Sequence, residues 1–283
     1  MNNLNYFEIA GASVPGTSHA KRGMNNQDHF TWLRTDDFII AVVSDGCGST
    51  KYSEVGSRLL STIFTNYLAK RLEQSKGVAG EILFQSERWW DELSQDVLAR
   101  IRIIAQDMGN PWLQYIKDYF LATLVGVIVR KDTTCVFSCG DGVFAVNGNL
   151  QEIGPFEGNK PPYLAYHLLG KELVDMDPSL LGIQRYGYWP TEEIHSLLIG
   201  TDGVGDLCKL ENVPFPAQEK LIGKIDQFWS EEIYFTNPQW MQNVLTTINT
   251  EKRKPVWAEK NIARYPGLLK DDTTLLTLRK KEV

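Results

Sequence analysis

Four segments of the sequence place an aspartate at the end of a strongly apolar run. Asp45 follows AVVS, Asp141 follows CVFSCG and Asp202 follows SLLIGT, and a glycine comes directly after each of these three. Asp271 and Asp272 reverse the order, because they precede the run TTLLTL. Short apolar runs of this kind are typical of buried β-strands. The pattern therefore predicts carboxylates carried on the ends of several strands.

Carboxylates in this arrangement could hold a cation. The hydrogen bonds of a sheet fix each strand end, so several strands can direct oxygen atoms at one point. Carboxylate sites without clustered His or Cys favour the hard cations Mg²⁺ and Mn²⁺. Each Asp-Gly pair could also be a simple turn, because both residues are common in turns. Four such aspartates, each next to a strand-like segment, favour a shared site.

Composition narrows the class of protein. Hydrophobic residues make up 43% of the 283-residue chain and charged residues 23%, which is ordinary for a globular protein. The net charge of −6 argues against nucleic acid as a partner, since phosphate-backbone binding needs clustered Lys and Arg. The longest apolar run, residues 120–129, is about half of what a membrane helix needs, and the first residues lack the features of a signal peptide. We therefore expect a cytoplasmic protein with no membrane or nucleic-acid partner.

The four cysteines show no CxxC spacing, so we expect packed thiols and no zinc site.

The order of the expected elements indicates an α+β protein. Strands are expected at residues 7–18, 28–33, 38–44, 122–130, 134–139, 143–146, 196–200 and 273–278. One helix should begin at Ser53, with Val55, Leu59, Ile63 and Tyr67 on its apolar face, and a second should cover 81–108. We expect a polar loop at HAKRGMNNQ, loop with short strands at 154–190, and helix at 217–253. Runs of strands separated by paired helices favour α+β layers over βαβ units.

Six motifs along the chain resemble those of a known family. GTSHAKRGMNNQDHF, AVVSDGCGSTKYSEVG, FLATLVGVIV, FSCGDGVFAV, LLIGTDGVGDL and DDTTLLTL follow the order of the metal-dependent protein phosphatases, the protein phosphatase 2C (PPM) family. The opening GTSH…G…QD resembles a bacterial branch of this family. The similarity spans residues 16–278, so we expect a single phosphatase domain over 1–283. It implies a four-layer α-β-β-α sandwich of two antiparallel sheets flanked by helix pairs.

The resemblance also implies roles for individual residues. Asp45 resembles the carboxylate that bridges two metal ions, and Gly46 resembles the residue that lends its main-chain carbonyl to one of them. Asp202 and Asp271 resemble the remaining direct ligands of the other ion. Asp28 resembles the acid that orients metal-bound water.

Asp141 and Asp206 resemble the acids that, with Asp202, hold a weaker third ion, whereas Asp272 is expected to be only a turn residue. The implied cofactors are two Mn²⁺ or Mg²⁺ ions, with a candidate site for a third. Two such ions about 3.5–4 Å apart lower the pKa of a bridging water. The resulting hydroxide would attack phosphorus directly, without a phospho-enzyme intermediate, so the catalytic role falls to Asp28 and Asp45.

Two departures from the family pattern affect the metal and proton chemistry. Gln27 replaces the Glu that precedes Asp28 in better-known members, which removes one negative charge. Cys47 stands where many eukaryotic members have a His that protonates the leaving group. Loss of general-acid help typically costs about 10²–10⁴ in rate.

A third departure affects substrate binding. Gly23 stands where the family has an Arg that grips the substrate phosphate, so Arg22, with Lys21 as second choice, is the candidate for this role. His19 in the same segment is a further candidate for contact with the substrate phosphate or with a carboxylate near the metals. The alternatives are a solvated charge for Arg22 and a hydrogen bond to a main-chain carbonyl for His19.

The resemblance favours a phosphoserine/phosphothreonine protein phosphatase that acts in signalling. Its substrate would be a phosphorylated protein, such as a serine/threonine kinase or the targets of one. One alternative is a weakly active or inactive regulatory module that binds phosphoproteins, and another is a hydrolase of small phosphate esters. The complete set of ligand positions favours an enzyme, whereas the departures at Gln27 and Gly23 keep the binding module open. Segments 154–190 and 217–253 are the expected places for substrate selection.

Overall fold

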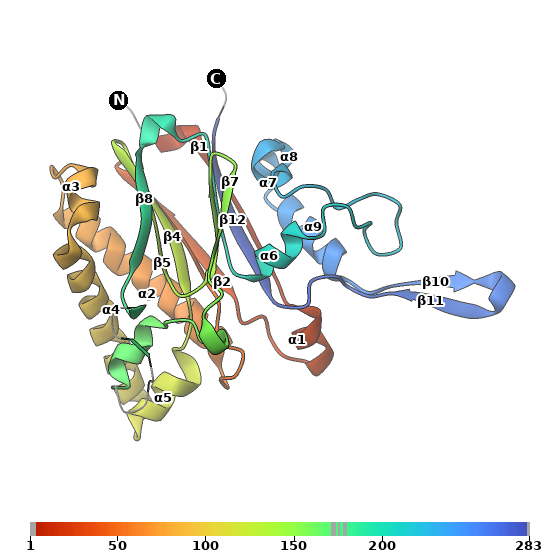
Figure 1. Ribbon diagram of the computed structural model, residues 1–283, viewed down its shortest axis with the longest axis horizontal. Helices are drawn as coiled ribbons and strands as arrows, with labels where there is room; N and C mark the ends of the chain where they lie inside the picture. The colour runs from red at the N-terminus through yellow and green to blue at the C-terminus, as the bar shows by residue number, and fades with distance from the viewer. Residues whose placement is uncertain (1–3, 171–173, 175, 178–179, 282–283) are drawn as a thin grey trace.

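Two five-stranded antiparallel sheets form the two central layers of the protein (Figure 1). The computed structural model describes residues 4–170, 174, 176, 177 and 180–281. The first sheet contains, in spatial order, β1 (Phe7–Val14), β12 (Thr273–Lys280), β9 (Ser196–Gly200), β6 (Gly142–Val146) and β7 (Asn149–Ile153). The second contains β2 (His29–Arg34), β3 (Phe38–Ser44), β4 (Leu124–Arg130), β5 (Thr133–Cys139) and β8 (Gln184–Pro190). Buried apolar side chains from both sheets, such as Val127 and Leu276, form one core between them.

Helices cover the outer face of each sheet, which confirms the predicted four-layer α+β sandwich (Figure 1). The second sheet is covered by α2 (Ser53–Gln74) and α4 (Glu87–Met108), accompanied by α3 (Gly80–Gln85) and α5 (Trp112–Tyr119). The first sheet is covered by α6 (Gly203–Cys208), α7 (Gln227–Ser230), α8 (Ile233–Thr236) and α9 (Trp240–Asn249). This outer layer is therefore built from short helices, and the segment 217–253, which was expected to be helical, contains α7, α8 and α9 with loops before and between them.

Local sequence signals fix the ends of α4. The hydroxyl oxygen of Ser86 accepts a hydrogen bond from the main-chain N–H of Trp89 (3.3 Å), which caps the first turn. This cap also divides the predicted helix 81–108 into α3 and α4. Gly109 ends α4 with a positive φ of 125°, which a residue with a side chain rarely adopts.

Helix α2 begins at Ser53 as expected but buries a different face from the predicted one. Leu60, Phe64 and Leu68 are fully buried against the sheet, whereas Val55 is 40% exposed. Gly56 lies on the buried face, where a Cβ atom would overlap the carbonyl oxygen of Tyr119. The contact between α2 and the end of α5 is thus so close that only glycine fits.

The strands of the sheets lie close to their predicted positions, but the predicted loop after β1 is a helix. The expected strand 7–18 ends at Val14, and α1 (Thr17–Arg22) follows. The N–H groups of Thr17 and Ser18 donate to the carbonyl oxygens of Leu269 (2.9 Å) and Lys270 (3.1 Å). The start of α1 is therefore tied to the segment that leads into β12.

An unexpected hairpin extends away from the layers (Figure 1). Its strands are β10 (Lys252–Val256) and β11 (Asn261–Tyr265), which pair only with each other. Nearly all of their residues are exposed.

All four cysteines are free. Cys135 and Cys139 are buried, and burial raises the pKa of both thiols to about 12. Within the described part of the chain, no helix has the length and apolar character needed to cross a membrane.

Candidate metal centre

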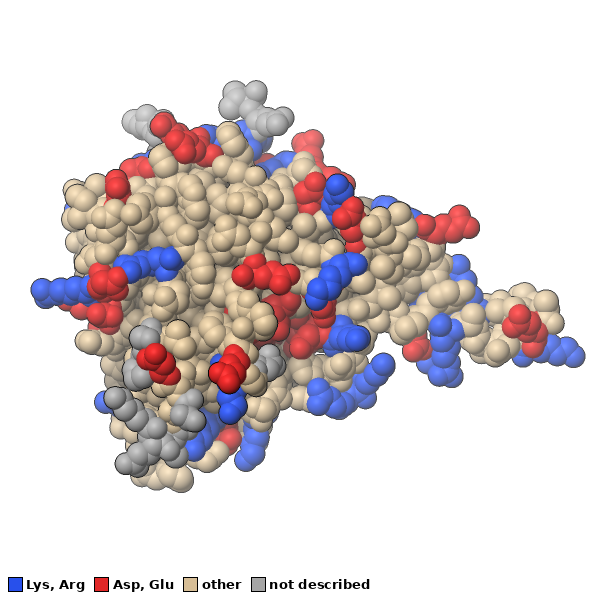
Figure 2. Space-filling model, viewed as in Figure 1, with Lys and Arg blue, Asp and Glu red and all other residues tan. Residues whose placement is uncertain are grey.

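An acidic pocket of about 270 Å³ lies at one edge of the first sheet. Its charged lining residues are Asp141, Glu152, Asp202, Asp206, Lys209 and Asp271. Figure 2 shows acidic side chains gathered near the middle of this face. Pairing in the sheet explains the convergence, because Gly200 at the end of β9 lies opposite both Val143 in β6 and Leu275 in β12. The aspartates beyond these strand ends consequently meet.

Two further aspartates reach the same place from the second sheet. Asp45 follows β3 and Asp28 precedes β2, and these neighbouring strands pair His29 with Ser44 at that end. The pKa of Asp45 is raised well above its usual value, first by burial and then by the negative charges of Asp28, Asp202, Asp271 and Asp141. The structure therefore brings together the four strand-end aspartates and Asp28, although they are far apart in the sequence.

Crowding of like charges also affects the other members of this group. Burial, followed by the charges of Asp141 and Asp271, raises the pKa of Asp202 to about 6. Burial likewise raises the pKa of Asp141. A group of carboxylates that resist simultaneous ionisation gains stability from a cation placed among them.

Asp28 offers an unused oxygen to this group. Its Oδ2 accepts a hydrogen bond from the Thr201 hydroxyl (2.7 Å), whereas Oδ1 is buried without a hydrogen-bond partner among the described residues. Burial is the main reason that the pKa of Asp28 lies well above its usual value. The amide oxygen Oε1 of the neighbouring Gln27 is also buried and unpartnered in the part of the structure that is described. Buried polar atoms without partners are rare, and two on consecutive residues fit a site that holds an ion or its water.

Gly46 allows the chain to approach this site closely. A Cβ atom at this position would lie 2.7 Å from the carbonyl oxygen of Ser53 and 2.8 Å from that of Gln27. Asp45 and Cys47 on either side form main-chain hydrogen bonds to the segment before β4. Within the described chain, the Gly46 carbonyl oxygen accepts none of these bonds, so it is available to a ligand.

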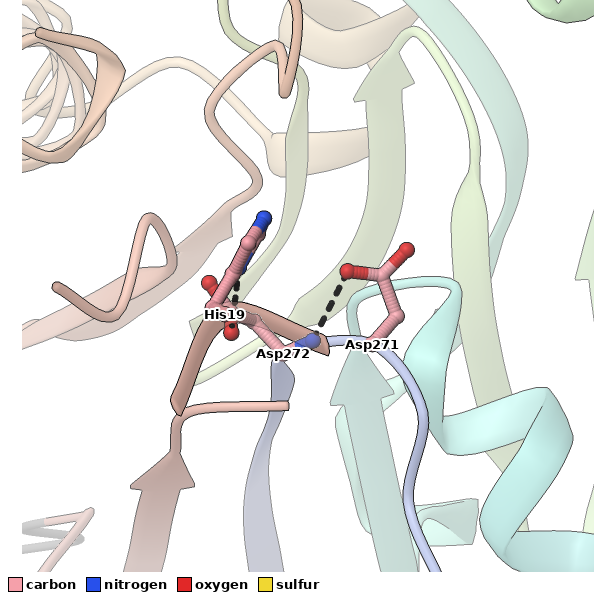
Figure 3. A group of neighbouring side chains, drawn as sticks. All are labelled: His19, Asp271 and Asp272. Carbon is pink, nitrogen blue, oxygen red and sulfur yellow. Dashed lines mark hydrogen bonds and ion pairs between the residues drawn. The ribbon is translucent and has the colours of Figure 1, made fainter. Parts of the chain in front are cut away.

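Asp272 has a different role from the one expected, because it is buried and holds together several parts of the chain (Figure 3). Its Oδ1 accepts hydrogen bonds from the Gly16 N–H (2.6 Å) and His19 Nδ1 (2.8 Å), and its Oδ2 accepts one from the Gln27 N–H (2.5 Å). The expectation that Asp272 is only a turn residue was therefore wrong.

His19, Asp271 and Asp272 form a compact group whose ligand atoms lie within 4.8 Å of one another. Asp272 accepts main-chain hydrogen bonds from Gly16 and Gln27, and an ionised carboxylate only accepts, so Nδ1 of His19 is the donor in the third bond. In Figure 3 one oxygen of Asp271 accepts a hydrogen bond from the main-chain N–H of Asp272 (2.9 Å), and the other oxygen points away from His19 and Asp272. We conclude that Asp271 belongs to the acidic pocket, which it lines, and that the His19–Asp272 pair fixes the chain next to Asp271.

The residues predicted to bind substrate phosphate lie outside the acidic group. Arg22 is exposed on α1, and its Nε donates to the carbonyl oxygen of Ser18 (3.1 Å). The alternative in which His19 contacts a carboxylate near the expected metal site is the one seen, because its Nδ1 lies 2.8 Å from Oδ1 of Asp272. Cys47 lies 3.2 Å from the Ser49 hydroxyl through its Sγ.

The sequence analysis missed Lys209, which lines the pocket. Its Nζ lies 2.9 Å from Oδ1 of Asp206, one helical turn earlier in α6. The spacing of three residues from a predicted ligand is the signal that could have identified it.

Comparison with known proteins assigns the family. A model of the protein phosphatase 2C family matches residues 15–247, and the chain therefore belongs to this family. No curated protein matches the chain in sequence.

Solved structures share its fold at low sequence identity. A bacterial serine phosphatase is 16% identical with a TM-score of 0.55, and the similarity covers 98% of this chain and 99% of that one. Serine/threonine phosphatase Stp1 from Staphylococcus aureus is 17% identical with a TM-score of 0.53, covering 96% and 94%. The catalytic domain of serine/threonine phosphatase PstP, solved with two manganese ions, is 14% identical with a TM-score of 0.45, covering 96% and 97%.

Proposed function

We propose that this protein is a phosphoserine/phosphothreonine protein phosphatase that depends on Mn²⁺ or Mg²⁺. The observation that supports the proposal is the convergence of Asp28, Asp45, Asp141, Asp202 and Asp271 from two sheets. Because the chain belongs to the protein phosphatase 2C family, this acidic group is the expected metal site of a phosphatase.

The resemblance of these positions to the family's motifs suggests the ligand set. Asp45, Asp202 and Asp271, with the carbonyl oxygen of Gly46, would hold two ions, and Asp28 would hold a water on one of them. Such ions, when bound, activate water and neutralise phosphoryl oxygens. An all-oxygen donor set is what Mg²⁺ and Mn²⁺ prefer. Asp141 and Asp206 would hold a third ion, for which Lys209 competes because it already pairs with Asp206.

Other residues would keep these groups in position. The Thr201 hydroxyl donates a hydrogen bond to Oδ2 of Asp28. This bond fixes the carboxylate and leaves Oδ1 without a partner among the described residues. Asp272 links the segments that carry Gly16, His19 and Gln27, so it would position Asp271 and the chain before Asp28 together. Lys209 would supply positive charge at the pocket, where the family position at Gly23 lacks an Arg.

The substrate would be a phosphorylated protein. We further propose that residues 1–283 form one catalytic domain, because β1 pairs along its whole length with β12 from the far end of the chain. A phosphoprotein-binding module with little activity is the competing function. It is favoured by Arg22, which bonds to its own helix and contacts none of the described acidic residues.

The test is hydrolysis of p-nitrophenyl phosphate and of a phosphothreonine peptide with Mn²⁺, with EDTA, and in the variant Asp45→Ala. We expect turnover of both substrates that EDTA abolishes and that Asp45→Ala lowers at least a hundredfold. Activity that survives the chelator would end the two-metal proposal. Binding of the peptide without turnover of either substrate in saturating Mn²⁺ would favour the binding module, and turnover of the small ester alone would favour a small-molecule phosphatase.

A further inference from the structure

The β10–β11 hairpin is an arm with almost no support from the rest of the protein (Figure 1). Its strands pair in register from Lys252 opposite Tyr265 to Val256 opposite Asn261. An isolated two-stranded hairpin is marginally stable in water. A partner that lies along the arm would therefore gain a surface that the fold itself does not use.

The arm is basic although the protein is acidic. Between Glu251 and Tyr265 there are five Lys or Arg residues and two Glu residues, whereas the whole chain has a net charge of −6. Arg253 and Arg264 lie directly opposite each other on one face of the hairpin. Like charges at such positions repel, and Glu251 compensates only in part through its ion pair with Arg253 (2.6 Å). This face would gain stability from an additional anion.

Apolar side chains are exposed on the same arm. Trp257, between the two strands, is 84% exposed, and Ile262 is 58% exposed. Ile262 lies two residues before Arg264 and so shares its face, because side chains alternate along a strand. Aromatic and Arg side chains are enriched at protein interfaces, where Lys and Glu are depleted. The arm thus combines anion-binding and apolar groups on one surface.

The base of the arm is connected to the acidic pocket. Five residues separate Tyr265 at the end of β11 from Asp271. Asn249 holds this connection, because its Oδ1 accepts from the Leu269 N–H (3.0 Å) while its Nδ2 donates to the Pro15 carbonyl (2.5 Å). Lys21 on α1 is close enough that its charge, after those of Arg253 and Arg264, lowers the pKa of Glu251. A basic track therefore runs from the arm along α1 toward the pocket, and Figure 2 shows Lys and Arg side chains along this side.

We propose that the β10–β11 hairpin is a docking arm for an acidic segment of the phosphoprotein substrate, separate in sequence from the phosphorylated residue. The proposal rests on the phosphatase function proposed above. An acidic polypeptide complements the arm, and its apolar residues can cover Trp257 and Ile262. A nucleic acid fits less well, since a continuous polyanion laid along the track would also meet the carboxylates of the pocket.

The test compares two phosphothreonine peptides that differ only in a distal segment, which is rich in Glu in one and in Gln in the other. We expect the wild-type protein with Mn²⁺ to show a KM at least tenfold lower for the Glu-rich peptide, and this difference should shrink in high salt. The double variant Arg253→Glu/Arg264→Glu should remove the difference and leave kcat and p-nitrophenyl phosphate turnover unchanged. Trp257→Ala should raise the KM of the Glu-rich peptide by a smaller factor.

The matched control is Lys70→Glu/Arg100→Glu, which reverses two exposed charges on α2 and α4 and should leave every KM unchanged. Equal KM values for both peptides in the wild-type protein would overturn the proposal while leaving the phosphatase function intact. A wild-type protein that turns over neither substrate contradicts the phosphatase function, and fluorescence anisotropy of the two peptides then tests the arm directly. In that case, selective binding of the Glu-rich peptide that the double variant loses supports the arm, and equal binding overturns it.

Two further outcomes would assign the arm to another partner. Binding of an oligonucleotide that the double variant loses, without selectivity between the peptides, would indicate a nucleic-acid contact. A dimer in sedimentation that the double variant converts to monomer, again without peptide selectivity, would indicate a second copy of this chain.

Discussion

Substitution of Asp202 is the clearest test of whether an aspartate of the pocket binds metal or only stabilises the fold. Asp202→Asn removes one carboxylate charge from the pocket without removing a core contact, so we expect kcat to fall more than tenfold at saturating Mn²⁺. The metal-free variant should melt at the same temperature as the metal-free wild type or higher, because burial, and then the charges of Asp141 and Asp271, raise the pKa of Asp202 and so penalise its ionised form. Steady-state kinetics and thermal melts with and without Mn²⁺ measure both effects.

Asp36→Asn is the matched control, because Asp36 is an exposed aspartate in the turn between β2 and β3. It should change neither kcat nor the melting temperature. Wild-type turnover in Asp202→Asn at saturating Mn²⁺ would show that Asp202 is not a ligand.

The aspartates could be predicted from sequence because each adjoins an apolar strand, and strand ends of neighbouring strands meet. Asp272 could not, since its role depends on three N–H groups that lie more than 240 positions away in the sequence. Arg22 was selected by its distance from Gln27 in the sequence, but α1 turns its guanidinium back to Ser18. Position in a motif therefore predicts where a side chain lies only where a sheet fixes the backbone.

At the scale of elements, Asp272 joins the start of β12 to α1 and to the chain before β2. Asp272→Ala leaves the N–H donors of Gly16, His19 and Gln27 without their acceptor in a buried place. We expect a loss of roughly 2–5 kcal/mol in the free energy of unfolding, since each buried unsatisfied donor costs about 1–3 kcal/mol. Urea unfolding of the metal-free protein measures this loss.

The variant Asp271→Ala is the control for this effect. It changes the adjacent carboxylate, which is exposed, so it should reduce Mn²⁺ binding and leave the unfolding free energy of the metal-free protein close to that of the wild type. If Asp272→Ala unfolds at the same urea concentration as Asp271→Ala, Asp272 does not link these elements.

The bounds of a strand or helix were predictable from sequence where one of its faces, or the whole element, consists of buried apolar or small residues. They were not predictable elsewhere. β3 and β9 have the predicted bounds because every position of their runs is apolar or small. The buried face of α2 was missed because it includes Ser57, Ser61 and Thr65, which interrupt the apolar period. The β10–β11 hairpin has no buried face, so alternation of apolar and polar residues, the main signal of a strand, is absent from it.

For the whole molecule, the acidic pocket makes stability depend on pH and on metal together. The pKa of Asp28, Asp45 and Asp202 is raised in the metal-free folded state, to about 6 for Asp202, so this state binds more protons than the unfolded chain above about pH 4. The stabilisation that these groups contribute is present below that pH and is lost as the pH rises through their folded-state values. We expect the melting temperature of the metal-free protein to fall between pH 5 and pH 7.5.

Mn²⁺ should reverse this dependence, because its ligands must be deprotonated and its affinity therefore rises with pH. The increase in melting temperature on adding Mn²⁺ should be larger at pH 7.5 than at pH 5, and smaller in Asp202→Asn than in Asp36→Asn at both. An equal increase at the two pH values would contradict a carboxylate site.

The pairing of β1 with β12 has a consequence for biosynthesis. In the first sheet β12 lies between β1 and β9, and it is the last of these strands to leave the ribosome. Until it emerges, β1 and β9 lack the neighbour that joins them, and Asp271 has not reached the other carboxylates. A nascent chain therefore lacks the complete acidic group, and it exposes unpaired strand edges to chaperones, until translation of this region is complete.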